Sequence, residues 1–595
     1  MKQFLSVFTG SNRLLIWILE IMLTCIILLF PTHLHYEYHP VQSPYVFDNL
    51  PLFSVIFAIW LGLLLLLLFT TKTKVKGNWE GLALVVVFSL VFLGFWGILT
   101  PDRQADGIWN LATVGYIVSS GTVAPHANVG YLDFPGIHIL AAALSQVTGF
   151  SIYISAVVIL IVFALLLSSL LYLLFSKTIE DPRLAGFAVL LAIQGNWTQS
   201  LSAFFWPRYI GLIFLVIFLV LLNRKADTVI GTMQDRILII ILLAAVTVSY
   251  FVTSMTFFFI LLGILLVQLV SRSHVKDREI TGTYPGVMVD WSSIIFFLMI
   301  PLMWELYYAV NFFGTIAQWI PGFVKDMAGG ELFSGVLQVA GANFGGSVPM
   351  WANVTRWFWL FFIYGLGGIL ALVSLFRIRK LNLTEKVAIG GLIGIIVVGV
   401  IGLFLSPGGT EAQRILMYAP FFLLPIIFCY FLKLKERIRN YALILMFIIF
   451  FTLSFPTFLA NNSRIVTDAY YPYDYASGEF MESKFGTGQG LAIFGVADTE
   501  LPLVYAGVRD ATYYATWATI KNKIDMWQQI GNLMISWGYS TGQNNMFILS
   551  QRGMGVFQRS FGVSVNDPGW SQLEQQLSGS NLIYNSTYVI IYQKK

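Results

Sequence analysis

The stretch that decides the fold is SIYISAVVILIVFALLLSSLLYLLF, residues 151–175, which contains no charged side chain. Roughly 20 mostly apolar residues are enough for a helix to cross a bilayer. The rest of the chain has the same character, because 57% of its 595 residues are hydrophobic and 11% are charged. Soluble proteins carry about 25% charged residues. The sequence therefore predicts a polytopic α-helical membrane protein.

Outward from this segment we predict thirteen transmembrane helices. Two of them are short and contain polar residues, but the charge pattern requires them. The thirteen segments are 14–31, 51–70, 80–99, 151–175, 183–196, 203–223, 236–250, 253–271, 292–312, 356–376, 387–405, 414–432 and 440–459.

The basic residues determine the predicted orientation. They fall in short clusters between apolar runs, which is typical of membrane topology and not of nucleic-acid binding. An odd number of crossings places all these clusters in the cytoplasm, with the N-terminus inside as a retained signal anchor. The clusters are 71–79, 224–235, 272–291, 377–386 and 433–439.

Residues 460–595 differ in character from residues 1–459. They contain turn-forming stretches and β-like segments such as GLAIFGV and NLIYNSTYVIIYQ, and no run long enough to span a bilayer. We predict a transmembrane catalytic domain at 1–459 and a small extracytoplasmic α/β domain at 460–595. The segment 136–148 is apolar but too short to span, so we expect it to lie along the outer membrane surface.

On this topology the polar residues of the outer face are few, and they are the candidates for chemistry. Several have structural explanations: Asp102 can cap a helix, Arg208 and Arg414 can anchor at the interface, and Glu411 can pair with Arg414. The candidates are Asp102, Arg103, Asp106, His126, Asp133, His138, Arg208, Glu305, Lys325, Asp326, Glu331, Arg356, Glu411 and Arg414.

The combination of these residue types suggests a reaction. Guanidinium groups match the oxygens of an anionic lipid head group. Aromatic side chains in the same loops offer surfaces for a sugar, and a carboxylate can remove the proton of an attacking hydroxyl. Glu305 falls inside a predicted helix, where an ionisable residue is costly and marks a functional site. The sequence leaves the cofactor open, and a divalent cation such as Mg²⁺ or Mn²⁺ would need ligands from separate loops.

The first outer loop carries a family resemblance. The aspartate near the start of this loop is followed by ATVGYIVSSGTVAP (112–125) and YLDFPGIHILAAALSQVTGFS (131–151). This arrangement resembles that of the membrane glycosyltransferases of the GT-C superfamily, and most of all the archaeal-type members. The closing NLIYNSTYVIIY (581–592) resembles the end of such chains. Asn110 replaces a histidine that many relatives carry, and the WWDYG motif of oligosaccharyltransferases is absent. The second difference argues against transfer of a whole glycan to asparagine.

The resemblance implies roles for individual residues. Asp106 becomes the leading catalytic base and Asp102 the second candidate. Arg208 and Arg414 would hold the phosphate of a polyprenyl (dolichyl-type) donor. The remaining candidates for substrate binding are Glu305, Glu331, Glu411 and His138.

The predicted function is transfer of one sugar from a polyprenyl-phosphate donor to a glycan, lipid or protein acceptor at the outer face of the cell membrane. The alternatives are a transporter or lipid-linked glycan flippase, a non-catalytic surface protein, and a glycan polymerase or ligase. Glu20, near the middle of the first helix, is the strongest point for a transporter.

Overall fold

We describe the fold from a computed structural model of the chain. It describes residues 11–37, 50–70, 79–93, 104–124, 132–179, 181–194, 207–225, 233–272, 291–309, 361–378, 383–405, 410–462, 472–495, 501–506, 511–515, 544–550, 580–586 and 589–593, with 321, 354–355, 358–359, 381, 508 and 575.

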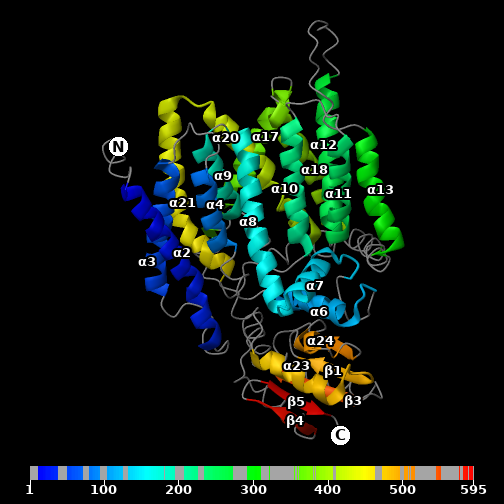
Figure 1. Ribbon diagram of the computed structural model, residues 1–595. Coiled ribbons are helices and arrows are strands. Elements are labelled where there is room, and N and C mark those ends of the chain that lie inside the picture. The colour runs from blue at the N-terminus through cyan, green and yellow to red at the C-terminus, as the bar shows by residue number, and fades with distance from the viewer. Residues whose placement is uncertain are drawn as a thin grey trace.

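The first part of the chain is a bundle of apolar helices (Figure 1). Its helices are α2 (Ser11–Glu37), α3 (Leu50–Thr70), α4 (Trp79–Phe92), α6 (Gln104–Ser120), α7 (Gly136–Thr148), α8 (Ile152–Thr178), α9 (Pro182–Gln194), α10 (Pro207–Lys225), α11 (Met233–Ser249), α12 (Phe251–Arg272), α13 (Trp291–Tyr307), the π-helix η2 (Phe361–Leu366), α17 (Gly367–Phe376), α18 (Leu383–Leu405), α19 (Thr410–Leu416), α20 (Pro420–Leu432) and α21 (Glu436–Asn462).

Every segment predicted to span the membrane overlaps a helix of this bundle. Within the described residues, five helical segments are long and apolar enough to cross a bilayer: Leu52–Thr70, Ile152–Thr178, Phe251–Ser271, Glu385–Gly402 and Glu436–Leu459. Eight more apolar helices of 10–17 residues accompany them in the same described part. The chain is therefore an integral, multi-pass membrane protein, and the count of thirteen crossings stays a prediction.

The predicted helix 414–432 is interrupted in the structure. Helix α19 ends at Leu416 and α20 begins at Pro420. In the turn between them the amides of Tyr418 and Ala419 donate to carbonyls three residues back, at 3.1 and 3.0 Å. Proline has no amide proton to donate and is favoured in the first turn of a helix. Pro420 therefore starts a new helix instead of continuing α19.

The bundle packs tightly where α12 meets α18. A Cβ atom added to Gly263 or Gly394 would collide with backbone atoms of the opposing helix. Small residues permit this close approach of two helices in a membrane. Helix α9 is buried from Leu184 to Gln194, so this short helix lies in the core of the bundle.

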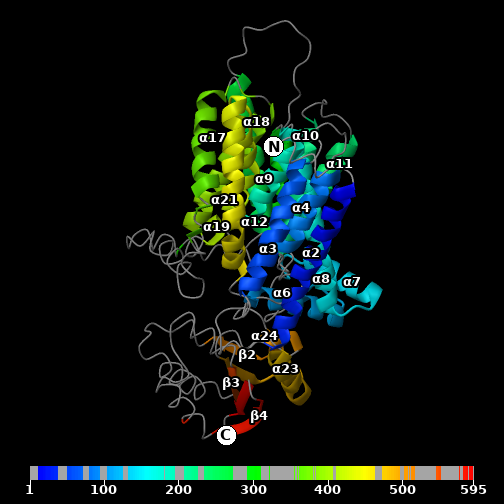
Figure 2. The ribbon, with the colours of Figure 1, turned by 90° about the vertical axis from the view of Figure 1, so that its left-hand side faces the viewer.

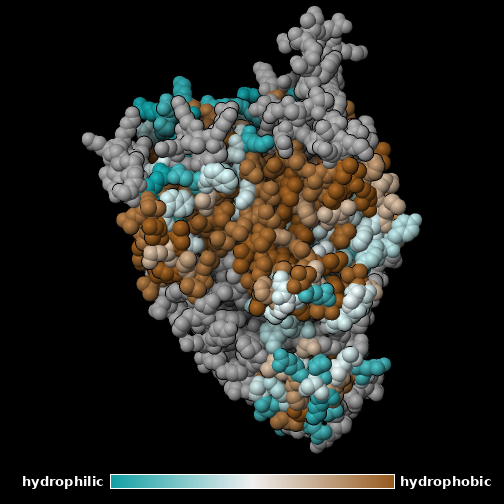
Figure 3. All heavy atoms as spheres, viewed as in Figure 1, coloured by the Kyte–Doolittle hydropathy of each residue, from teal (hydrophilic) through white to brown (hydrophobic). Residues whose placement is uncertain are grey.

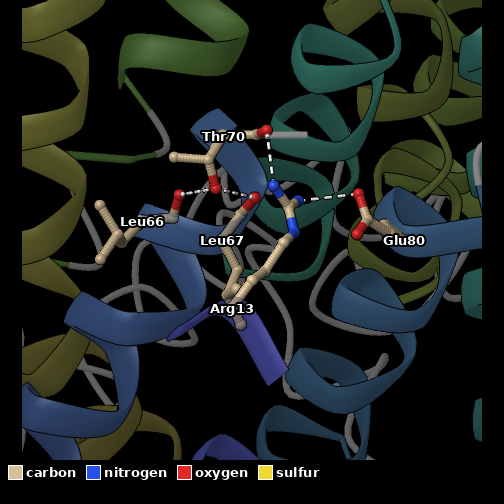
Figure 4. A network of polar contacts seen from close by, with 5 residues as sticks. All are labelled: Arg13, Leu66, Leu67, Thr70 and Glu80. Atoms are coloured by element: carbon tan, nitrogen blue, oxygen red, sulfur yellow. Dashed lines mark hydrogen bonds and ion pairs between the residues drawn. The ribbon is translucent and has the colours of Figure 1, made fainter. Parts of the chain in front are cut away.

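On the face shown in Figure 3, hydrophobic side chains form a broad band over the bundle, with hydrophilic residues at the upper rim and on the C-terminal part. The ion pairs among the described residues lie at this hydrophilic end of the bundle. Arg13 of α2 donates to Glu80 Oε2 at 2.8 Å and to the Thr70 carbonyl at 2.9 Å (Figure 4). Lys433 pairs with Glu385 at 2.7 Å. The end of the bundle next to residues 177–183 and 433–439 is therefore the one predicted to face the cytoplasm.

The C-terminal part is a mixed α/β unit at the opposite end. It contains α23 (Pro472–Phe485), β1 (Leu491–Gly495), α24 (Leu501–Ala506), β2 (Thr512–Ala515), β3 (Asn544–Ser550), β4 (Asn581–Asn585) and β5 (Val589–Gln593). The strand order is β2-β1-β3-β5-β4. Strand β1 runs parallel to β2 and β3, and β5 runs antiparallel to β3 and β4. The boundary at residue 460 and the extracytoplasmic location stay predictions.

Two helices lie between the bundle and this unit. Figures 1 and 2 both show α6 and α7 at the end of the bundle, with α23, α24 and the sheet beyond them. Helix α7 has the residues predicted for the surface helix, and Gly149, whose φ of 73° is left-handed, caps its C-terminal end. Ile139, Leu140 and Val147 of α7 are exposed apolar residues, as expected of a helix on a membrane surface.

Candidate functional site

The candidate site lies at this end of the bundle, which is the end predicted to face outward, where α6, α7 and the ends of α10 to α13 and α19 meet. Asp106 lies in the first turn of α6. Its side chain and that of Glu411 in α19 fall outside the described part of the chain. So do seven other candidates in their entirety: Asp102, Arg103, His126, Lys325, Asp326, Glu331 and Arg356.

Helix α6 is fixed to α7 by a buried polar contact. His138 Nε2 lies 2.7 Å from Asn110 Oδ1, and both side chains are fully buried. Burial disfavours the charged imidazolium and lowers the pKa of His138 to about 3, while a hydrogen bond to the Phe134 backbone acts in the opposite direction. The imidazole is therefore neutral at physiological pH. His138 holds the helix that carries Asp106 and lies away from solvent.

The C-terminal unit covers the other side of α6. Ile108 is fully buried. It packs with Trp109 of its own helix, with Tyr475 of α23 and with Tyr505 of α24. The two tyrosine rings lie 5.4 Å apart. Helix α6 is thus enclosed by α7 on one side and by the C-terminal unit on the other.

The end of α13 holds the first outer loop. Trp304 Nε1 donates to the Asp133 carbonyl at 3.0 Å, and the Tyr308 hydroxyl donates to the Val123 carbonyl at 3.1 Å. Glu305, between these two residues, is 2% exposed, and its Oε2 atom has no hydrogen-bond partner among the described atoms. The carboxylate of Asp133 interacts electrostatically with Glu305. Two acids therefore lie together beside the loop that leads into α7.

The basic part of the site lies at α19. Arg414 is partly buried, and its Nη1 atom donates to the Tyr250 hydroxyl at 3.2 Å. Nearer the bundle centre, the hydroxyls of Tyr418 and Thr253 are 2.7 Å apart. These two contacts join α19 and its following turn to the start of α12. Arg414 is thus held by the bundle, whereas a simple interfacial anchor would need no such contact.

Two glycines bring the remaining helix ends to the same place. A Cβ atom on Gly136, the first residue of α7, would lie 2.8 Å from Ser249 Oγ. A Cβ atom on Gly211 of α10 would lie 2.8 Å from Thr253 Oγ1. Arg208, partly buried, lies three residues before Gly211, so it is about one turn further out on α10. The joint between α11 and α12 therefore contacts α7, α10 and α19.

The structure brings some predicted residues together. Arg208, Arg414, Glu305 and His138 all lie at this end, on four different helices. Among the described residues, no group of three His, Cys, Asp or Glu side chains could hold a metal ion. Sequence reasoning did not identify Tyr250 or Trp304 as site residues, because their polar atoms act on partners that are more than 150 residues away in the chain.

Comparisons with known proteins add little to this geometry. No protein-family model and no curated protein matches the sequence. Among solved structures, the chain is similar to ArnT from Cupriavidus metallidurans in the apo state, with 12% sequence identity and a TM-score of 0.43. The similarity covers 86% of this chain and 97% of that one. At this level it assigns neither a family nor an activity, so the function must be inferred from the residues of the site.

Proposed function

We propose that the chain is a GT-C-like glycosyltransferase that moves a sugar from a polyprenyl-phosphate donor to an acceptor hydroxyl at the outer face of the membrane. The observation that carries the proposal is the convergence of arginines and acids at one end of the bundle. Arg414 contacts Tyr250, whose neighbour Ser249 lies against Gly136, and Asp133, three residues before Gly136, interacts with Glu305. The helix that carries Asp106 lies across this end.

Asp106 is the proposed base. It takes the proton of the acceptor hydroxyl, whose oxygen attacks the anomeric carbon of the donor. The bond between that carbon and the phosphate oxygen breaks, and the configuration at the carbon is inverted. Polyprenyl phosphate leaves with the bonding electrons. Arg208 and Arg414 stabilise the negative charge that develops on its oxygens.

Glu305 is proposed to orient a substrate hydroxyl. A buried carboxyl group needs hydrogen-bond partners whether or not it carries its proton, and the buried Oε2 atom of Glu305 has none within the described part of the protein. Leaving a buried acceptor unsatisfied costs about 1–3 kcal/mol. A sugar or acceptor hydroxyl bound beside α13 would remove this cost, so binding at Glu305 is favoured.

The test uses purified protein and a panel of radiolabelled polyprenyl-phosphate sugars, with products separated by chromatography. The proposal predicts that one donor is consumed and that label appears in an acceptor with release of polyprenyl phosphate. Label that crosses the bilayer of a proteoliposome while still attached to its lipid would instead support a flippase. A ladder of products of increasing length would support a polymerase.

A further inference from the structure

The joint between α11 and α12 is a single residue, Tyr250. Its amide donates to the Val246 carbonyl at 2.9 Å, which continues α11. Its own carbonyl accepts from the Ser254 amide at 3.3 Å, which begins α12. The backbone of Tyr250 is therefore fixed by both helices. Because the Cα atom of Tyr250 is fixed in this way, its side chain can hold a hydrogen-bond partner in one position.

Three helices reach this joint in matching register. In the outer layer Arg414 donates to the Tyr250 hydroxyl. One turn deeper, Tyr418 contacts Thr253, and Gly211 of α10 lies against the same threonine. Because Arg208 precedes Gly211 by three residues and Tyr250 precedes Thr253 by three, Arg208 lies at about the depth of Tyr250. Arg414 of α19 thus contacts Tyr250, and Arg208 of α10 lies at about the same depth of the bundle.

We propose that Tyr250 is a positioning residue that holds the Arg414 guanidinium beside Arg208, so that the two form one binding site for the phosphate of an isoprenyl phosphate. This inference rests on the proposed function and names a residue which that function does not include. Tyr250 itself needs no contact with the phosphate. It acts through Arg414.

The physical reason is the cost of ordering arginine. Fixing its side chain in one rotamer costs up to about 2 kcal/mol of conformational entropy. A hydrogen bond to Tyr250, made before the ligand arrives, removes part of this cost from binding. The contact uses one of the five N–H groups of the guanidinium, whose planar fork is suited to binding phosphate oxygens in pairs.

The experiment measures binding of farnesyl phosphate to the full-length protein in detergent by isothermal titration calorimetry, with inorganic phosphate and farnesol as comparison ligands. Tyr250→Phe removes only the hydroxyl. We expect affinity for farnesyl phosphate to fall about tenfold, as for loss of one hydrogen bond to a charged group. Weak binding of inorganic phosphate falls by a similar factor, and farnesol binding does not change.

Tyr418→Phe is the matched control, because it removes a buried tyrosine hydroxyl one turn deeper that bonds Thr253 instead of an arginine. It should leave phosphate affinity within about twofold of the wild type. In an Arg414→Ala background, Tyr250→Phe should cause no further loss, since a residue that acts only through Arg414 has nothing left to position. A purely structural role would instead make the two losses add.

The inference is overturned if Tyr250→Phe binds farnesyl phosphate as tightly as the wild type. It is equally overturned if Tyr418→Phe loses as much, or if the Tyr250→Phe and Arg414→Ala losses add. Each of these results leaves the proposed function standing, because the wild type still binds the isoprenyl phosphate. If the wild type binds farnesyl phosphate no better than farnesol, the proposed donor is wrong as well.

Discussion

Asn110 Oδ1 and His138 Nε2 lie 2.7 Å apart, and this contact joins the helix that carries Asp106 to the helix on the membrane surface. In the family that the sequence resembles, many members carry a histidine at the position of Asn110. In this chain an imidazole from α7 lies next to that position. The position thus contributes to the placement of α6.

Asn110→Leu should destabilise the protein and slow transfer. The change removes the acceptor of a buried imidazole, which costs about 1–3 kcal/mol, and it loosens α6 with the proposed base. Ser168→Ala is a suitable control, because Ser168 is also fully buried but bonds carbonyls of its own helix. Thermal unfolding in detergent and the transfer rate are the measurements. An unchanged melting temperature for Asn110→Leu would show that the contact contributes nothing.

The buried neutral His138 predicts a pH dependence of stability. Its pKa is about 3 in the folded protein and about 6.5 when unfolded. Between these values the unfolded state binds the proton and the folded state does not. Stability is therefore lost as pH falls from about 6.5 towards 3, by up to ~1.4 kcal/mol per pH unit from this residue. His138→Gln should flatten this slope between pH 6.5 and 4.5. Equal slopes for the two proteins would mean that the imidazole is protonated or solvated when folded.

The glycines between α12 and α18 give a third prediction. Gly390→Ala places a methyl group against the backbone of Ile264, at 2.5 Å from its Cα atom, and overpacking of this kind costs about 1–3 kcal/mol or more. Gly368→Ala in α17 meets nothing within 4 Å and should be neutral or slightly stabilising. Melting temperatures in detergent distinguish the two. If Gly390→Ala melts no lower than Gly368→Ala, the two helices are further apart than described.

Much of the architecture follows from the sequence, because long apolar runs must be helices in a bilayer. Residues 136–148 are too short to span, and the structure makes them a separate helix on the bundle end. The interruption before Pro420 was not predicted, although its proline was visible in the sequence. The run 414–432 is apolar throughout most of its length, and we therefore predicted one continuous helix. The partners of Arg414 and Asn110 depend on which helix ends meet, and nothing in a single sequence states that.

Glu20 offers a test against the transporter alternative. It is fully buried in α2, and neither of its carboxyl oxygens has a hydrogen-bond partner among the described atoms. Replacing an unsatisfied buried polar group by an apolar one of similar size is neutral or stabilising. We therefore expect Glu20→Leu to melt at or above the wild-type temperature and to transfer sugar at the wild-type rate. A transporter that uses this acid would lose its activity with Glu20→Leu and also with Glu20→Gln.

The most direct test of the proposed function is the transfer rate of Asp106→Asn, measured with the labelled donor that the wild type consumes. The amide has nearly the shape of the carboxylate but cannot accept the proton, and loss of a general base typically costs 10²–10⁴-fold. Asp181→Asn, which alters an aspartate paired with Arg183 at the opposite end of the bundle, is the control. We predict that Asp106→Asn folds, inserts and binds farnesyl phosphate but transfers sugar at least about 100-fold more slowly. Transfer near the wild-type rate by this variant would contradict the assignment of Asp106 as the base.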